Sequence, residues 1–253
     1  KTFLGETGNF NGDDVIKIIA KQDATSKFVA RHLYNFFVAD EVPVPSWEHV
    51  PPKDEAAIQL LSETYIKSNY SIKEMLRVLF NSDFFKVSGF MKVKSPAELV
   101  LGTLRSTKDF YHIDGADTSV YDVMEESGFM GQKLTNPPSV EGWHTGEEWI
   151  TSGALVDRVN FASRYLSDPG NVGVDRMLSR IDELVGDKDG PEKFVDACLS
   201  VLGEIEVSKE TYESLMVIAE HSYSVNPERV HMDHEAIMKI FQIVSSSREF
   251  QLC

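Results

Sequence analysis

Apolar residues recur at three- and four-residue spacing along most of the chain, with charged or polar residues between them. Side chains at this spacing lie on one face of an α-helix, so the pattern predicts amphipathic helices. Nowhere do β-branched residues alternate with polar ones for more than a few positions, as they would in a half-buried strand. We therefore predict an all-α fold, a multi-helix domain in which any strands are short.

Two short motifs predict where helices begin. The segment Ser95–Glu98 reads Ser-Pro-Ala-Glu, which places a serine at the N-cap, a proline at the first helical position and a glutamate at the third. It predicts a helix over Pro96–Lys108. Ser71 and Glu74 have the same spacing as the serine and glutamate of that motif, and they predict a second capping box.

Another helix is predicted from about Thr25, and its large apolar side chains recur at helical spacing. We expect five of them to line one face: Phe28, Val29, Leu33, Phe36 and Phe37. The segment Asp40–Pro52 follows and contains four prolines, so it should form a loop that carries Trp47.

The segment Met130–Ile150 departs from the helical pattern. Polar residues, glycines, prolines and tryptophans crowd together in it, and a helical register resumes only at Ser152. The prolines stiffen the backbone, the glycines permit its turns and the indoles can anchor it to a core. We therefore predict a long ordered loop rich in proline and tryptophan.

Charge narrows the possible functions. Of the 253 residues, 25 are basic and 40 acidic, a formal net charge of -15. Binding to nucleic acid or to anionic lipid needs a basic surface, so we expect neither partner. No apolar run is long enough to predict a membrane span. Because acidic residues are enriched toward the C-terminus, we predict a helical core over residues 1–167 and an acidic helical part over residues 168–253, packed on the same core.

The cysteines and histidines predict no metal site and no cofactor. Cys198 and Cys253 lie far apart and have neither disulfide-framework, redox nor zinc-ligand spacing. His231 and His234 lie near acidic residues, but their spacing does not match that of a zincin-type motif.

The candidate chemistry gathers in the segment Trp143–Trp149. His144 is a candidate general acid or base, and Glu147 or Glu148 could pair with it. The indoles of Trp143 and Trp149 are candidate platforms for a sugar ring. Arg158 could bind a substrate carboxylate or sulfate, or it could brace the loop by donating to its carbonyl groups. A purely structural role for this segment is the favoured interpretation.

Several motifs along the chain resemble the bacterial domain-of-unknown-function family numbered 1800. They occur in the family's order: the leader Lys1–Gly5, a helix start at Gly12–Ile16, the aromatic helix Phe28–Phe37, the turn Lys94–Val100, the block Pro137–Ile150 with the following Arg158–Phe161, and an ending at Ser247–Gln251. The resemblance spans essentially the whole chain and identifies it as the C-terminal part of the family domain.

The resemblance carries further implications. It implies a helical portion before the Lys1–Gly5 leader, which would be one partner of this chain. Genes of the family often neighbour genes for exported, sulfatase-like proteins. The resemblance therefore implies an extracytoplasmic location, periplasmic or extracellular, and a co-exported sulfatase-like protein as another partner. The resemblance supplies no catalytic residue.

Two functions remain open at this stage. The first is a non-catalytic binding or scaffold module in an exported complex that handles a polymer or glycan. The second is a hydrolase-like enzyme acting on a polymer or glycan around the Trp143–Trp149 loop, with Arg158 at the same cleft. Convergence of His144, Glu147 and Arg158 on one concave site would favour the enzyme, whereas buried indoles and diverging polar groups would argue against it.

Overall fold

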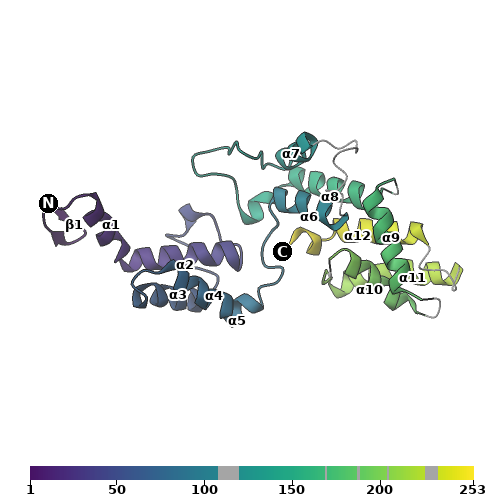
Figure 1. Cartoon of the computed structure of the whole chain (residues 1–253), viewed down its shortest axis with the longest axis horizontal. Coiled ribbons are helices and arrows are strands. Elements are labelled where there is room, and N and C mark those ends of the chain that lie inside the picture. Colours follow the sequence, from purple (N-terminus) through teal and green to yellow (C-terminus); the bar gives the residue numbers. More distant parts are fainter. Residues whose placement is uncertain (108–119, 169, 187–188, 204, 226–232) are drawn as a thin grey trace. The chain divides into compact units, whose positions relative to one another are not determined.

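The computed structural model describes residues 1–107, 120–168, 170–186, 189–203, 205–225 and 233–253 (Figure 1). Helices dominate this part of the chain. The sheet found in it consists of two short antiparallel strands, β1 (Thr2–Phe3) and β2 (Glu6–Thr7). The prediction of an all-α, multi-helix fold is therefore confirmed. Among these residues no helix is both long enough and apolar enough to cross a membrane.

The chain divides by its contacts into two compact units, which we call the N-terminal unit (Lys1–Lys92) and the C-terminal unit (Val93–Cys253). The helices of the N-terminal unit are α1 (Gly12–Ala20), α2 (Asp23–Phe37), the 3-10 helix η1 (Val44–Ser46), α3 (Glu55–Lys67), α4 (Ile72–Asn81) and α5 (Asp83–Lys86). Its core forms where α2, α3 and α4 pack together, around Ala30, Tyr34, Leu61, Met75 and Leu79.

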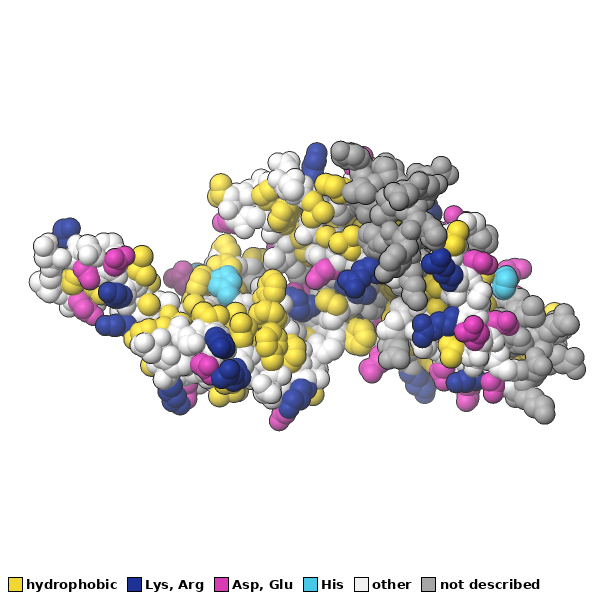
Figure 2. All heavy atoms as spheres, in the orientation of Figure 1, with side chains coloured by type: hydrophobic (Ala, Val, Ile, Leu, Met, Phe, Trp, Pro, Cys, Tyr) yellow, Lys and Arg dark blue, Asp and Glu magenta, His cyan; other side chains and the backbone are white. Residues whose placement is uncertain are grey.

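The apolar residues of α2 are buried to different extents. The buried positions are Ser26, Ala30, Arg31 and Tyr34, whereas Phe36 is 70% exposed. Of the five residues predicted to share one face, Val29, Leu33 and Phe37 are half-buried and pack against the core of the N-terminal unit, whereas Phe28 and Phe36 are exposed. Phe36 and Phe37 of α2 continue a row of edge-to-face ring contacts with Phe80 of α4 and Phe85 of α5, in the order Phe36, Phe37, Phe80 and Phe85. Figure 2 shows hydrophobic side chains gathered on the visible surface of this unit.

The proline-containing segment between α2 and α3 is held by a buried ion pair. Arg31 donates from Nε and Nη2 to Oε2 of Glu41, at 3.1 and 2.6 Å, and the two side chains are 7% and 1% exposed. The guanidinium also donates to the carbonyls of Val50 and Pro51 and lies 4.7 Å from the ring centre of Trp47. The loop predicted over Asp40–Pro52 is thus present and contains the single turn of η1. The hydrogen bonds of Arg31 hold it against α2.

In its described residues the C-terminal unit contains these helices: α6 (Pro96–Thr107), α7 (Val120–Phe129), the 3-10 helix η3 (Gly146–Trp149), α8 (Ser152–Leu166), α9 (Val172–Leu184), α10 (Pro191–Val201), α11 (Lys209–Val225), α12 (His234–Ser246) and the 3-10 helix η5 (Glu249–Gln251). A single hydrophobic core extends from Leu99 in α6 to Phe250 in η5. Residues on both sides of position 167 contribute to it. The division of the chain at 167 and 168 stays a prediction.

The capping motifs agree with the structure in one case and differ in the other. At the start of α6, Glu98 N donates to Ser95 Oγ and Ser95 N donates to Glu98 Oε2, at 3.3 and 2.7 Å. This capping box and its helix are confirmed. At the start of α4, Ser71 Oγ accepts from Glu74 N, but the Glu74 carboxylate accepts from Arg77 instead of closing the box. The ion pair of Glu74 with Arg77, three residues further along α4, therefore competes with the capping box for the Glu74 carboxylate.

Candidate functional site

The Pro/Trp loop, residues 130–150, is ordered by its own hydrogen bonds. Ser139 and Gly142 form an isolated antiparallel bridge, and the last turn of the loop is η3. Gly131 has a φ of +99°, and a Cβ atom there would lie 3.7 Å from the Trp149 ring. The glycine is needed for the left-handed backbone conformation of this turn, since a Cβ atom would make only an ordinary van der Waals contact with the indole.

Both tryptophans anchor the loop, by different means. Trp149 is 5% exposed and belongs to the buried residues of the C-terminal unit. Trp143 is half-buried, and its indole Nε1 donates to the carbonyl of Lys133 at 3.1 Å. This bond joins positions ten residues apart along the loop. The indoles that sequence analysis offered as sugar platforms thus also hold the loop in one conformation.

The polar groups of the loop lie on its surface. Nδ1 of His144 is 3.5 Å from Oε1 of Glu148, with side chains 58% and 42% exposed, and the imidazole meets the Trp149 ring edge to face. The other carboxylate oxygen of Glu148 accepts from Thr145 N at 3.3 Å. Glu147 is exposed. The structure therefore brings His144 and Glu148 together and gives Glu148 a second, structural contact.

Arg158 is engaged elsewhere in the C-terminal unit. It lies on the core face of α8 and is 0% exposed. Its Nε donates to Oε1 of Gln251 at 2.8 Å and its Nη2 donates to the carbonyl of Lys94 at 2.9 Å. The expected hydrogen bonds from Arg158 to carbonyls of the Pro/Trp loop are replaced by bonds to η5 and to the segment before α6. This guanidinium is closed to a ligand in solvent.

Burial sets the electrostatics of Arg158. Removal from water lowers the pKa of Arg158 to about 10, and the negative charge of Glu98 opposes this change. Burial also lowers the pKa of Lys94, whose Nζ donates to the carbonyl of Phe250 at 2.8 Å. The desolvated side chains of Lys94 and Arg158 thus hold the C-terminal segment against α8 and the residues before α6, which is a structural role.

Of the histidine pair weighed as a metal site, His234 is the member that the structure describes. His234 begins α12, and Asp233 is the N-cap of that helix, accepting from Ala236 N at 3.1 Å. His231 lies outside the described residues. Within the described residues, no three His, Cys, Asp or Glu side chains are grouped closely enough to hold a metal ion. Cys198 is buried in the core, while Cys253 is exposed.

Comparison with known proteins gives one match. The model of a family described as a protein of unknown function, DUF1800, matches residues 1–252. The chain belongs to this family. No curated protein and no solved structure matches it. Membership therefore confirms the resemblance carried by the motifs, while the functional hypotheses rest on the geometry above.

The anchoring of the loop can be measured at Trp143. We expect Trp143→Phe to lower the free energy of unfolding of the C-terminal unit by about 1 kcal/mol, the usual contribution of one hydrogen bond. The phenyl ring retains the apolar contact but cannot donate to Lys133. Urea denaturation followed by far-ultraviolet circular dichroism, with hydrogen exchange of the loop amides, would measure the change.

His144→Ala is the matched control in the same loop. Its contact with Glu148 is exposed, so we expect a change within about 0.5 kcal/mol. Equal losses from the two substitutions would show that the indole hydrogen bond does not anchor the loop.

Proposed function

We propose that this chain is a non-catalytic binding module of an exported, extracytoplasmic complex, and that it presents the Pro/Trp loop to a polymer or surface glycan. The observation that carries the proposal is that Arg158 bonds to Gln251 and Lys94 and does not join the His144–Glu148 pair. Arg158 is buried among Gln251 and Lys94, Glu148 accepts a hydrogen bond from its own loop, and Glu147 is exposed to solvent. Catalysis requires such groups to converge on one reacting centre.

The same geometry suits recognition of a sugar. Trp143 is partly exposed, and the same loop carries the exposed side chains of His144 and Glu147. Aromatic faces pack against the apolar faces of sugar rings, and carboxylates and imidazoles bind hydroxyl groups. A loop already held in one conformation loses little conformational entropy when it binds.

The hydrolase alternative has one observation in its favour. A carboxylate 3.5 Å from Nδ1 of a histidine can orient the imidazole as a general base, and Glu148 has this relation to His144. Both side chains are nevertheless largely exposed, and Arg158 is not part of the arrangement.

A polysaccharide binding assay tests the proposal. We expect affinity electrophoresis of the full chain in gels that contain bacterial surface polysaccharide to retard the protein. Glu147→Ala should weaken the interaction by about fivefold, because it removes one charged hydrogen-bonding group without disturbing the fold. Val156→Ala, an exposed change on α8, is the control and should bind normally.

Two results would contradict the proposal. Retardation that Glu147→Ala and His144→Ala leave unchanged would exclude the loop as the binding surface. Release of reducing ends from the polysaccharide that depends on His144 would establish the hydrolase instead.

A further inference from the structure

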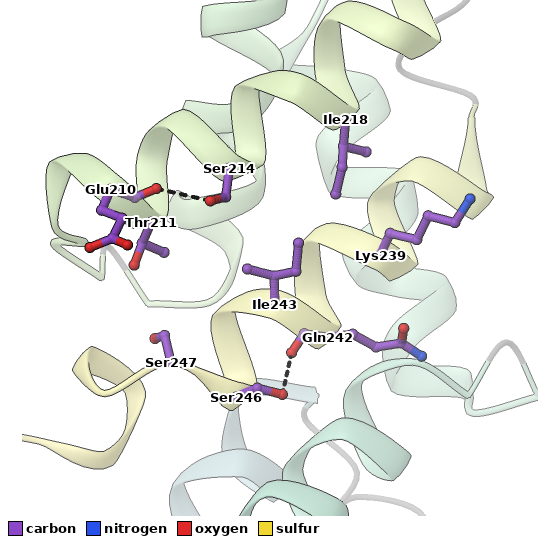
Figure 3. A pocket seen from close by; sticks show the side chains of 9 residues that line it. All are labelled: Glu210, Thr211, Ser214, Ile218, Lys239, Gln242, Ile243, Ser246 and Ser247. Atoms are coloured by element: carbon purple, nitrogen blue, oxygen red, sulfur yellow. Dashed lines mark hydrogen bonds between the residues drawn. The ribbon is translucent and has the colours of Figure 1, made fainter.

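A groove between α11 and α12 shares no residue with the Pro/Trp loop. Its volume is about 620 Å³, within the range of ligand-binding clefts. Each helix contributes one face to it, and Figure 3 shows these side chains lining the space between the helices. Those used below are Glu210, Ser214 and Ile218 on α11, and Lys239, Ile243 and Ser246 on α12.

The apolar part of the groove lies between the two helices. Ile218 and Ile243 are half-buried, pack against the core of the C-terminal unit and point into the space between α11 and α12 (Figure 3). They offer an apolar surface for an aliphatic side chain.

Two hydroxyl groups toward the Glu210 end, those of Ser214 and Ser246, are placed as hydrogen-bond acceptors. Ser214 donates its hydroxyl hydrogen to the carbonyl of Glu210 at 3.0 Å, and Ser246 donates its own to the carbonyl of Gln242 at 2.7 Å. Since each hydroxyl hydrogen is already used, these oxygens face a ligand as acceptors. The exposed Glu210 carboxylate adds a further acceptor with a negative charge.

At the other end of the groove, the positive charge of Lys239 is paired with a carboxylate of the same helix. Lys239 Nζ donates to Oε1 of Glu235 at 2.7 Å. The groove therefore matches a ligand that carries positively charged N–H donors on an aliphatic stem, as lysine and arginine side chains do.

The charge of the whole unit favours the same class of ligand. The C-terminal unit contains 14 basic and 28 acidic residues, whereas the N-terminal unit contains 11 and 12. Nearly all of the net negative charge therefore belongs to the unit with the groove, where it attracts cations and accelerates their association.

The length of the groove favours a peptide. Eight helical residues separate Glu210 from Ile218, a rise of about 12 Å. An extended chain covers that distance in about four residues. We propose that this groove binds an extended basic segment of a partner protein, with a lysine or arginine at Glu210 and an apolar side chain against Ile218 and Ile243.

Fluorescence anisotropy of the full chain with a labelled octapeptide of alternating lysine and valine tests this proposal. We expect saturable binding that Glu210→Gln weakens by about fivefold, the effect of one partly exposed charge pair. Glu220→Gln is the matched control on α11, an exposed glutamate outside the groove, and should change the affinity by less than about twofold. Ser214→Tyr places a large ring in the groove and should abolish binding.

Several results would overturn the proposal. Absence of binding by the octapeptide would do so, as would equal losses from Glu210→Gln and Glu220→Gln, which indicate unspecific attraction to the acidic unit. Equal binding of an octapeptide with glutamate in place of lysine would exclude recognition of a cation. Full competition by spermidine at the peptide's own concentration would identify a small polyamine as the ligand. None of these results depends on the polysaccharide assay, because the loop is unchanged in every variant.

Discussion

Glu41→Ala is expected to destabilise the N-terminal unit by about 3–5 kcal/mol, because it leaves a buried guanidinium without its counter-charge. The Glu41 carboxylate is 1% exposed and accepts two hydrogen bonds from Arg31 through Oε2. Its Oε1 accepts from Lys53 N at 2.8 Å. One substitution thus removes three hydrogen bonds and strands a charge in a place that water does not reach.

The Glu41→Ala substitution should loosen the structure first near Arg31. Arg31 also holds the carbonyls of Val50 and Pro51, and its guanidinium stacks over Trp47. Native-state hydrogen exchange measured by mass spectrometry should therefore show faster exchange in residues 40–53 and in α2, with little change in α8 or α12. Urea denaturation gives the free energy itself.

Two companion variants make this result specific. Glu48→Ala removes an exposed carboxylate from the same loop and should change stability by less than about 0.5 kcal/mol. The double variant Arg31→Leu, Glu41→Leu should cost less than the two single changes added together, since it leaves no unpaired charge. A loss at Glu41→Ala no larger than that at Glu48→Ala would mean that the pair does not hold the loop.

Local patterns predicted the parts of this fold that local physics controls. The helix α6 was predictable because its capping box lies within four consecutive residues, and the Pro/Trp loop was predictable because prolines and glycines exclude a helix from it. The ion pair of Arg31 and Glu41 was not predicted, since ten residues of chain separate partners on a helix and in a loop. Nothing in the periodicity of either segment indicates that they meet.

The same limit explains the candidate site. Arg158 follows the Trp block closely in sequence, which made it look like part of one site. Its partners, Lys94 and Gln251, lie 64 and 93 residues away along the chain. Only the packing of α8 against η5 and the start of α6 shows that the guanidinium points into the core. The groove between α11 and α12 left a weaker signal, the four-residue spacing of Glu210, Ser214 and Ile218 on one helical face.

Gly173→Ala should destabilise the C-terminal unit by about 3 kcal/mol, although replacing a helical glycine with alanine usually stabilises a protein. Gly173 is buried in the first turn of α9, against the end of α6. A Cβ atom there would lie 2.6 Å from the Thr107 Cβ and 2.8 Å from the Thr107 carbonyl carbon, and closer still to the carbonyl oxygen. Because backbone atoms are involved, a change of rotamer does not relieve the contact, and α6 and α9 have to separate.

The chain contains a closely matched control for this substitution. Gly153 is the second residue of α8, as Gly173 is of α9, and a Cβ atom at Gly153 meets nothing within 4 Å. We expect Gly153→Ala to stabilise the protein by about 0.5–1 kcal/mol, so the two variants should shift the urea midpoint in opposite directions. Thr107→Ala should fail to rescue Gly173→Ala, because the carbonyl group of residue 107 remains in place. A stabilising Gly173→Ala, or rescue by Thr107→Ala, would show that the ends of α6 and α9 are not in close backbone contact.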